Sequence, residues 1–178
     1  MDLDILERIN QQIVSGIGDL KKYFQKEEDF SVFRYLQEDL ILFLEEHTRD
    51  GAIAKLIDLL DGKGKLEDKQ IFHDAIMERE KIVSTGIGIG VAIPHAKLQG
   101  YEDFFIAVGI QKKQGIDWNA LDGSLVRIIF LIGGPDHKQT EYLKILSCLT
   151  QAIREEERRK KILQSPGAMD VLQLFTRC

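Results

Sequence analysis

Residues 79–97 read REKIVSTGIGIGVAIPHAK, and this stretch carries the strongest signal in the chain. It opens with the charged end of a predicted helix and closes on a short apolar segment followed by Pro94 and His95. Between these parts, glycine stands at alternate positions: Gly86, Gly88 and Gly90. Because glycine has no Cβ, such a segment can bring its own amide groups close to an anion. The pattern predicts a helix, a glycine-rich loop and a buried strand, in that order.

His95 stands at the predicted end of that strand, where side chains tend to point toward loops that carry function. Ser84 and Thr85 add hydroxyls at the entrance of the loop, and Arg79 adds the forked donors of a guanidinium. A nucleophilic imidazole beside groups that bind an anion is the arrangement that a phosphoryl acceptor needs. Taken alone, the glycines favour a tight connection between helix and strand, so the argument depends on the residues around them.

Other chemistries find no support in the sequence. The glycine loop leads to Pro94-His95 rather than to a helix, so it is not a dinucleotide-binding fingerprint, and no GxxxxGK[ST] phosphate loop is present. A GxSxG nucleophile elbow is also absent. The remaining histidines share no spacing that suggests zinc and are better explained as surface residues; these are His47, His73 and His137. We therefore expect neither a metal nor a cofactor.

The composition is that of a globular protein. Of 178 residues, 44% are hydrophobic and 30% are charged, with a formal net charge of −5. Proteins that bind nucleic acid usually carry a basic surplus, so we expect no nucleic-acid partner. Apolar runs such as 128–132 are too short to insert in a membrane, and MDLD does not begin a secretory signal. Cys148 and Cys178 predict no disulfide framework, and together these features favour a cytoplasmic location.

Residues 1–26 repeat apolar side chains at steps of three and four, which predicts one amphipathic helix. The acidic cluster at 27–29 marks a boundary. We therefore predict an N-terminal helical extension over 1–29 and a main domain over 30–178. The apolar face of the helix either packs on the protein's own surface or forms a homodimer or partner interface, and the sequence leaves both open.

The main domain alternates helical and extended patterns, which indicates an α/β fold. Thr48 and Asp68 are predicted N-caps of two helices. Strands are predicted at residues 40–44, where a helix stays open, and at 91–93, 104–110 and 125–132. The last of these is nearly continuous in apolar residues, so we expect it to be central. Gly133-Gly134-Pro135 is expected to end it, and helical patterns follow from residue 138.

The run Arg79-Glu80, Ser84-Thr85-Gly86-Ile87-Gly88 and Gly90-Val91-Ala92-Ile93-Pro94-His95 resembles the signature of a known family. It is similar to the type-2 IIA domains of the bacterial phosphoenolpyruvate:sugar phosphotransferase system. This family includes the fructose and mannitol IIA domains and the nitrogen-regulatory IIA protein. The resemblance extends over about residues 31–178. It implies a mixed β-sheet flanked by helices, as in the mannitol-type IIA fold.

The resemblance also implies a role for the residues that match the motif. His95 would be the catalytic residue and accept a phosphoryl group from the histidine phosphocarrier protein, with Arg79 near that group. Ser84, Thr85 and the loop around Gly86 and Gly88 would stabilise its charge. Sugar-specific members then pass the group to a cysteine of a IIB domain, whereas in nitrogen-type members it sets which regulatory partner is bound. We expect a phosphotransferase-type phosphoryl carrier of the regulatory or the fructose type.

Two positions depart from the family pattern. Where many members carry a second histidine that faces the first, this chain has Tyr142, and a position that is often polar is Ile89. Tyr142 can donate a hydrogen bond to a phosphoryl group but has no positive charge at neutral pH. Both changes would make the site less polar. The alternative function is therefore a non-enzymatic regulatory binding module that retains the IIA fold with impaired phosphotransfer.

Overall fold

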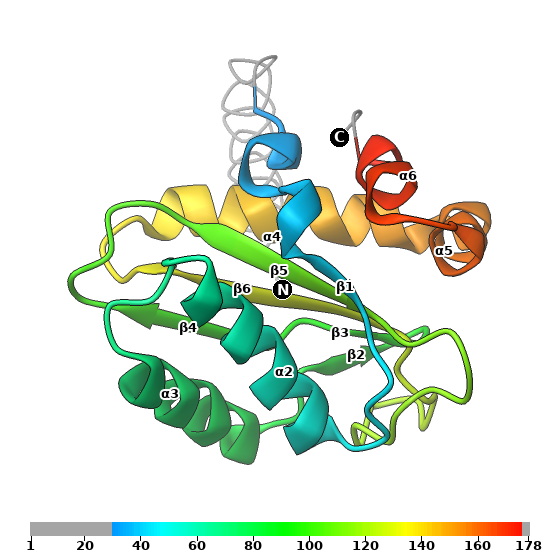
Figure 1. The fold of residues 1–178 in the computed structure, drawn as a ribbon, viewed down its shortest axis with the longest axis horizontal. Helices are drawn as coiled ribbons and strands as arrows, with labels where there is room; N and C mark the ends of the chain where they lie inside the picture. Colours follow the sequence, from blue (N-terminus) through cyan, green and yellow to red (C-terminus); the bar gives the residue numbers. More distant parts are fainter. Residues whose placement is uncertain (1–29, 176–178) are drawn as a thin grey trace, which may run out of the picture. The chain divides into compact units, whose positions relative to one another are not determined.

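The computed structural model describes residues 30–175, and the N-terminal extension predicted over 1–29 lies outside them. The described part has an α/β fold with one mixed sheet, as predicted (Figure 1). Its strands are β1 (Ile41–Phe43), β2 (Gly86–Gly88), β3 (Val91–Ala92), β4 (His95–Leu98), β5 (Phe105–Ile110) and β6 (Ile128–Pro135). Its α-helices are α2 (Arg49–Gly62), α3 (Lys69–Ile82), α4 (Gln139–Arg154), α5 (Glu156–Gln164) and α6 (Ala168–Gln173), preceded by 3-10 turns η1 (Val32–Tyr35) and η2 (Glu38–Leu40).

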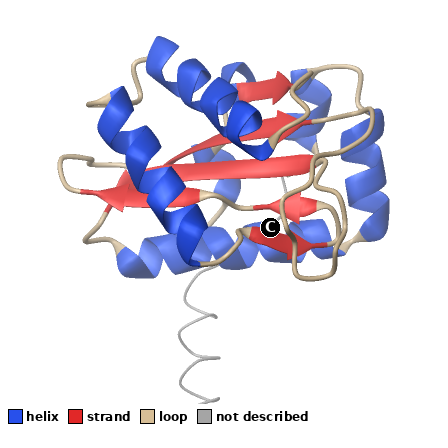
Figure 2. Ribbon diagram, turned by 90° about the horizontal axis from the view of Figure 1, so that it is seen from below, coloured by secondary structure: helices blue, strands red, loops and turns tan. Residues whose placement is uncertain are grey.

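The sheet has the strand order β1-β5-β6-β3-β2, and β4 also pairs with β6. The pairs β1/β5, β3/β6 and β4/β6 are parallel, whereas β5/β6 and β2/β3 are antiparallel. Helices α2 and α3 cover one face of the sheet and α4 covers the other, as the two views show (Figures 1 and 2). Because β6 pairs with three other strands, it is the central strand that the sequence predicts.

Both predicted helix starts are confirmed. The Thr48 side chain accepts a hydrogen bond from the amide of Gly51, and the Asp68 side chain accepts one from the amide of Ile71. Each side-chain oxygen thereby satisfies an amide that has no partner within the first helical turn. The apolar faces that follow are packed on the sheet by residues that are almost wholly buried: Ile53, Leu56, Ile57, Leu60, Phe72 and Ile76. These two helices place the end of α3 beside the sheet.

The expected break at Gly133-Gly134-Pro135 is wrong, because β6 runs through all three residues and every one of them is buried. Close packing explains why glycine stands there. A Cβ on Gly133 would lie 2.4 Å from the Phe105 ring, and one on Gly134 would lie 2.3 Å from the Phe104 ring. These glycines therefore let two aromatic rings lie directly on the strand, one on each face.

Three other features differ from the sequence-based expectations. Gly86 and Gly88 belong to β2, which pairs with β3, so part of the glycine stretch is strand rather than loop. The sequence predicts that Ser165-Pro166 starts the last helix, with proline in its first turn, but that helix begins at Ala168. Cys148, on α4, is disulfide-bonded although the sequence predicts no disulfide framework, and Cys178 lies outside the described residues. Among the described helices, none has the length and apolarity needed to cross a membrane.

Candidate functional site

His95 is the first residue of β4, and Pro94 lies immediately before it in the short segment between β3 and β4. Strands β3 and β4 both lie along β6, at Ile128 and Ile129 for β3 and from Ile132 onward for β4. Among the described strands, β4 pairs only with β6, so its other edge is not covered by a strand. The half-buried imidazole of His95 therefore stands at an edge of the sheet that helices α3 and α4 approach from opposite faces.

Two neighbours fix the same tautomer of His95. Its Nδ1 lies 2.9 Å from the carbonyl oxygen of Ile93, and its Nε2 lies 3.2 Å from Nε of Arg79. A carbonyl can only accept a hydrogen bond and a guanidinium can only donate one. The ring is consequently neutral, with a proton on Nδ1 and a lone pair on Nε2. Arg79 is itself held in place at the end of α3, because its Nη1 donates to the carbonyl of Val83 at 2.9 Å.

The electrostatic environment favours the neutral ring. Burial lowers the pKa of His95 below its ordinary value, and the positive charges of Arg79 and Lys97 lower it further. The hydrogen bond to the Ile93 carbonyl opposes these effects and is weaker than the burial effect. A lone pair on Nε2 is therefore available at neutral pH, which a nucleophilic imidazole requires.

We expect an NMR titration of His95 to have a midpoint below 6.5, the ordinary value for histidine. The neutral form should persist as the pH falls past that value, because protonation would place a second charge against Arg79. Below the midpoint, 15N shifts should change at Nε2, which gains the proton. Arg79→Met should raise the midpoint, whereas Lys81→Met, at an exposed cation of the same helical turn, should leave it unchanged. A midpoint at or above 6.5 in the wild type would contradict the geometry.

Tyr142 packs against the other side of His95. The two ring centroids are 5.6 Å apart, and the Phe104 ring stacks on Tyr142 with a centroid separation of 6.0 Å. The Phe104 ring occupies the space that a side chain on Gly134 would fill. Burial raises the pKa of Tyr142 to about 12, so its hydroxyl stays protonated at neutral pH. The structure thus brings together three of the predicted site residues: His95, Arg79 and Tyr142.

Lys97 is a member of this cluster that the sequence analysis missed. Its ammonium lies 4.4 Å from the centroid of the Tyr142 ring and donates a hydrogen bond to Oε1 of Gln139. The spacing could have indicated it, because residues two apart on a strand share a face. Lys97 follows His95 by two residues on β4, so a strand that begins at His95 places both side chains on one side.

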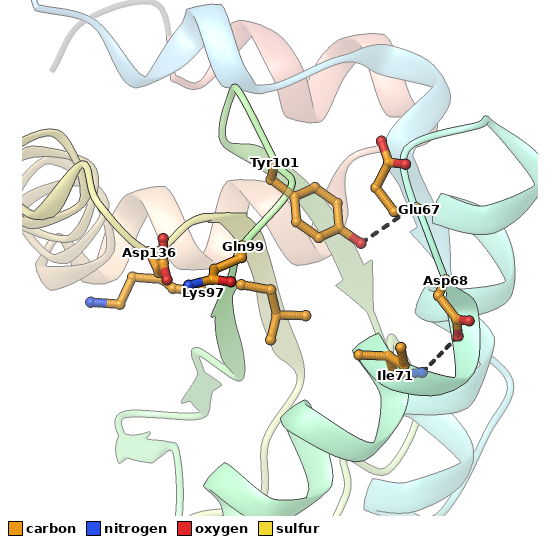
Figure 3. Close-up of a pocket in the computed structure, with 8 residues that line it drawn as sticks. Glu67, Asp68, Ile71, Lys97, Gln99, Tyr101 and Asp136 are labelled. Atoms are coloured by element: carbon orange, nitrogen blue, oxygen red, sulfur yellow. Dashed lines mark hydrogen bonds between the residues drawn. The ribbon is translucent and has the colours of Figure 1, made fainter.

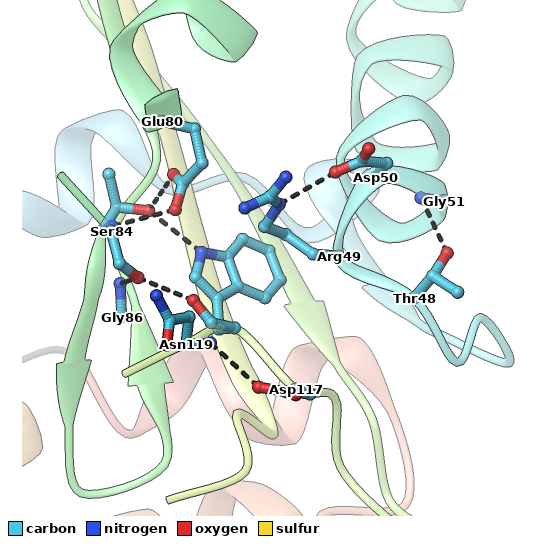
Figure 4. A network of polar contacts seen from close by, with 11 residues as sticks. Thr48, Arg49, Asp50, Gly51, Glu80, Ser84, Gly86, Asp117 and Asn119 are labelled. Carbon is cyan, nitrogen blue, oxygen red and sulfur yellow. Dashed lines mark hydrogen bonds and ion pairs between the residues drawn. The ribbon is translucent and has the colours of Figure 1, made fainter. Parts of the chain in front are cut away.

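Ser84 and Thr85 have other partners. The hydroxyl of Ser84 donates to the carbonyl of Trp118 at 2.7 Å and accepts from the amide of Gly86. The buried hydroxyl of Thr85 donates to Glu80 at 2.5 Å and accepts from the indole of Trp118 at 3.1 Å (Figure 4). In the structure these hydroxyls have structural partners, and their phosphoryl-binding role stays a prediction. They fix the segment that follows α3 to the loop that carries Trp118.

Glu80 lies at the centre of this network, and its substitution tests how much the network contributes to stability. Its carboxyl group accepts from both the amide and the hydroxyl of Thr85, and its side chain is 4% exposed. Glu80→Ala leaves these buried donors unpaired, so we expect the free energy of unfolding to fall by about 2–3 kcal/mol. Urea denaturation would measure the loss. The matched control is Glu78→Ala, at an exposed carboxylate on the same helix, which should cost less than about 0.5 kcal/mol.

The glycine stretch does present its amides to an anion, but that anion is part of the chain. The amide of Ile89 donates to the Asp122 carboxylate at 2.9 Å, and the amide of Gly90 donates to the Ser124 hydroxyl. Hydrogen bonds from Ser124 and Ile89 lower the pKa of Asp122 to about 2. The amides of Ile89 and Gly90, which follow Gly88, are therefore occupied by side chains of the same chain in the structure. They are not open to a phosphoryl group in this arrangement.

Ile89 does not line the pocket of His95, so the expectation that it makes the site less polar is wrong. Gly90 lies beside Ile128 of β6, whereas His95 lies beside Ile132. Four residues of strand separate these points by about 13 Å. Ile89 instead lines a small cavity of about 150 Å³ with residues of α5. Of the two departures from the family pattern, only Tyr142 touches the site.

A larger hollow of about 410 Å³ lies next to the site, between the start of α3 and the end of β4 (Figure 3). It is lined by Glu67, Asp68, Ile71, Lys97, Leu98, Gln99, Tyr101 and Asp136. Lys97 belongs both to this lining and to the group around Tyr142, whereas His95 is not among the lining residues. The chemistry of the site therefore rests on the contacts of His95 rather than on this hollow.

Comparison with known proteins places these observations in a family. The family model for the phosphoenolpyruvate-dependent sugar phosphotransferase system, EIIA 2, matches residues 34–178. The fructose-specific EIIABC component of Bacillus subtilis is 34% identical over 134 residues, which are 75% of this chain and 21% of that protein. The chain thus spans about one fifth of that relative. The fructose-specific EIIA component of Haloferax volcanii is 34% identical over 133 residues, which cover 74% of this chain and 86% of that protein.

Nitrogen-regulatory proteins and solved structures match as well. A nitrogen regulatory protein homolog of Haemophilus influenzae is 29% identical over 82% of this chain and 80% of its own length. The crystal structure of nitrogen regulatory protein IIA-Ntr from Neisseria meningitidis has a TM-score of 0.75 and 26% identity, over 82% of this chain and 99% of that one. IIA mannitol from Escherichia coli shares the fold, with a TM-score of 0.67 and 20% identity over 79% of this chain and 99% of that one.

The residues that match the family model, 34–178, include the mixed sheet and the pair of His95 and Arg79 at its edge. The chain belongs to the EIIA type-2 family of the phosphoenolpyruvate-dependent phosphotransferase system.

Proposed function

We propose that this protein is a phosphoryl carrier in which Nε2 of His95 accepts a phosphoryl group from the histidine phosphocarrier protein. One observation supports this most directly. The carbonyl of Ile93 and the guanidinium of Arg79 each require the tautomer that leaves a lone pair on Nε2. A histidine with a merely structural role needs only a satisfied hydrogen bond, but this one also has a depressed pKa and a cation at its nucleophilic atom.

The transfer from one imidazole to the other needs no additional proton donor. The lone pair of Nε2 forms the new nitrogen–phosphorus bond while the phosphorus–nitrogen bond of the donor breaks, and that electron pair stays on the donor nitrogen. When the second nitrogen of the donor ring is protonated, each imidazole keeps its own N–H throughout. On His95 the hydrogen bond from Nδ1 to the Ile93 carbonyl holds the ring in the orientation for attack.

Arg79 then exchanges one partner for another. In the structure its Nε donates to the lone pair that must attack the phosphorus. As the phosphoryl group arrives, the guanidinium moves from the ring nitrogen to a phosphoryl oxygen, where charge develops during the transfer. Its contact with the Val83 carbonyl keeps it at the end of α3 during this change. Tyr142 closes the opposite side and offers a neutral hydroxyl.

The relatives support two kinds of partner for the phosphorylated protein. Both fructose-specific and nitrogen-regulatory proteins match the chain, so a sugar IIB domain and a regulatory protein are each a suitable acceptor or target. One solved relative at 19% identity, with a TM-score of 0.67, is the complex of IIAMtl with phosphorylated IIBMtl from Escherichia coli. The proposal therefore includes both a regulatory role and a fructose-type role for the phosphorylated protein.

Tyr142 favours a second candidate function, a regulatory binding module that no longer transfers phosphate efficiently. Its phenol is neutral at neutral pH, so it supplies no positive charge beside the phosphoryl site. A direct experiment separates the two. The full chain is incubated with phosphoenolpyruvate, enzyme I and the histidine phosphocarrier protein, and acid-labile phosphate is measured and mapped by mass spectrometry. Label on His95 supports the carrier, and no label with verified partner proteins supports the binding module.

A further inference from the structure

Lys97 is the cation at the site that the proposed transfer does not yet use. It and His95 are two residues apart on β4, so their side chains share the face of the strand that α4 covers. Its ammonium lies over the Tyr142 ring, and that ring in turn contacts His95. The alternate residues of β4, Ala96 and Leu98, belong to the apolar core on the other face.

The phosphorylated site needs more positive charge than Arg79 provides. A phosphoryl group brings about two negative charges at neutral pH. Arg79 supplies one positive charge, and Tyr142 supplies none, because a phenol is never cationic. Its pKa of about 12 means only that it stays neutral rather than becoming an anion. The group that many family members place at position 142 is therefore replaced by an uncharged ring, and the nearest cation on that ring is Lys97.

The contacts of Lys97 leave its charge free to act. Of its recorded partners, Gln139 offers an amide oxygen and Tyr142 offers the face of a ring, and neither is an anion. Its influence already reaches His95, since its positive charge lowers the pKa of that ring. Two residues along a strand span about 6.7 Å, a distance that the flexible four-carbon stem of a lysine can cover.

We propose that Lys97 is the second cationic residue of the phosphoryl site: it rests on Tyr142 and Gln139 while His95 is unmodified, and it moves to the phosphoryl oxygens when Nε2 is phosphorylated. A hydrogen bond from an ammonium to a phosphoryl oxygen is stronger than one to a neutral amide or a contact with a ring. Phosphorylation therefore frees the Gln139 side chain, at the first residue of α4. This inference rests on the proposed function of His95.

The test compares Lys97→Met with Lys97→Arg, and the matched control is Lys55→Met, at an exposed lysine on α2. Each full-length variant is mixed with enzyme I, the phosphocarrier protein and phosphoenolpyruvate. The measurements are the equilibrium between phosphorylated carrier and phosphorylated His95, and the half-life of phosphohistidine at pH 8. We expect Lys97→Met to shift the equilibrium by about tenfold toward the phosphorylated histidine phosphocarrier protein. Lys97→Arg and Lys55→Met should stay within threefold of the wild type.

A measurement on the unmutated protein guards against misfolding of a variant. On phosphorylation, the 15N chemical shift of the Lys97 ammonium should change, and a scalar coupling between this nitrogen and phosphorus should become detectable. The 15N shift of the Lys55 ammonium should stay the same. If the wild type takes up label while Lys97→Met matches it in equilibrium and half-life, or the Lys97 resonance stays unchanged, the role of Lys97 is refuted and the carrier function stands. If the wild type takes up no label, the carrier function itself fails.

Discussion

His95→Ala abolishes the incorporation of acid-labile phosphate, with less than about 1% of the wild-type label remaining after long incubation with enzyme I and the phosphocarrier protein. The effect is total rather than partial because the alanine variant has no nucleophile that can replace Nε2. Arg79, Tyr142 and Lys97 carry no group that is both nucleophilic at neutral pH and held beside the phosphoryl donor. Radiolabelled phosphoenolpyruvate followed by acid and alkali treatment measures both the amount and the chemical class of the label.

The control for this experiment is a histidine that lies on the surface, away from the site of His95. His137→Ala removes a side chain that is 63% exposed in the turn after β6, so it should retain full labelling. Circular dichroism should show that both variants are folded, since neither ring is part of the apolar core. Phosphate that remains on His95→Ala and is still acid-labile would place the acceptor at another residue and refute the proposed function.

Local signals explain what the sequence could predict. Thr48 and Asp68 each cap a helix through an amide three residues away, so the relevant partner lies within the same short window of sequence. The position of His95 after a proline and a short apolar strand is equally local. For these features, the pattern of residues and the physical cause are contained in the same few residues.

Long-range contacts explain what it could not. Gly133 and Gly134 look like a strand end in the sequence. The rings that require their small size belong to Phe105 of β5 and to Phe104 just before it, far away in the chain. Ser84 and Thr85 look like ligands of an anion, but Trp118, which lies more than thirty residues later, takes both hydroxyls into its own network. Such partners are set by the fold, so neither spacing nor composition predicts them.

The anion-binding loop illustrates the same limit in a different way. Alternate glycines predicted exposed amides, and the structure does place amides around a carboxylate, yet the carboxylate is that of Asp122. The local chemistry was predicted and the identity of the anion was not. Under the proposed function, we therefore expect side chains, and above all Arg79, to stabilise the charge of a phosphoryl group on His95.

Arg79→Met should therefore slow the phosphorylation of His95 by about 10²–10³-fold, the range found when a charge-stabilising donor is removed from an active site. Its guanidinium contacts Nε2 directly, whereas the loop amides at Ile89 and Gly90 are already occupied. Arg79→Lys should recover only part of the rate. A lysine keeps the charge, but it cannot hold the Val83 carbonyl and a phosphoryl oxygen with the fixed fork of a guanidinium.

The design must separate this effect from a change in the pKa of His95, because Arg79 also lowers that pKa. Single-turnover rates are therefore measured at pH 8, where the ring is neutral with or without Arg79, and across a range of phosphocarrier concentrations. A deficit in the limiting rate at pH 8 assigns Arg79 to the transfer itself, whereas a deficit that appears only in acid would assign it to the ring. Lys81→Met, at a cation 67% exposed on the same turn of α3, controls for the lost charge and should stay within threefold of the wild type. An Arg79→Met variant equally close to the wild type at pH 8 would show that the guanidinium orients the imidazole without stabilising the phosphoryl group, and the charge would then have to come from Lys97.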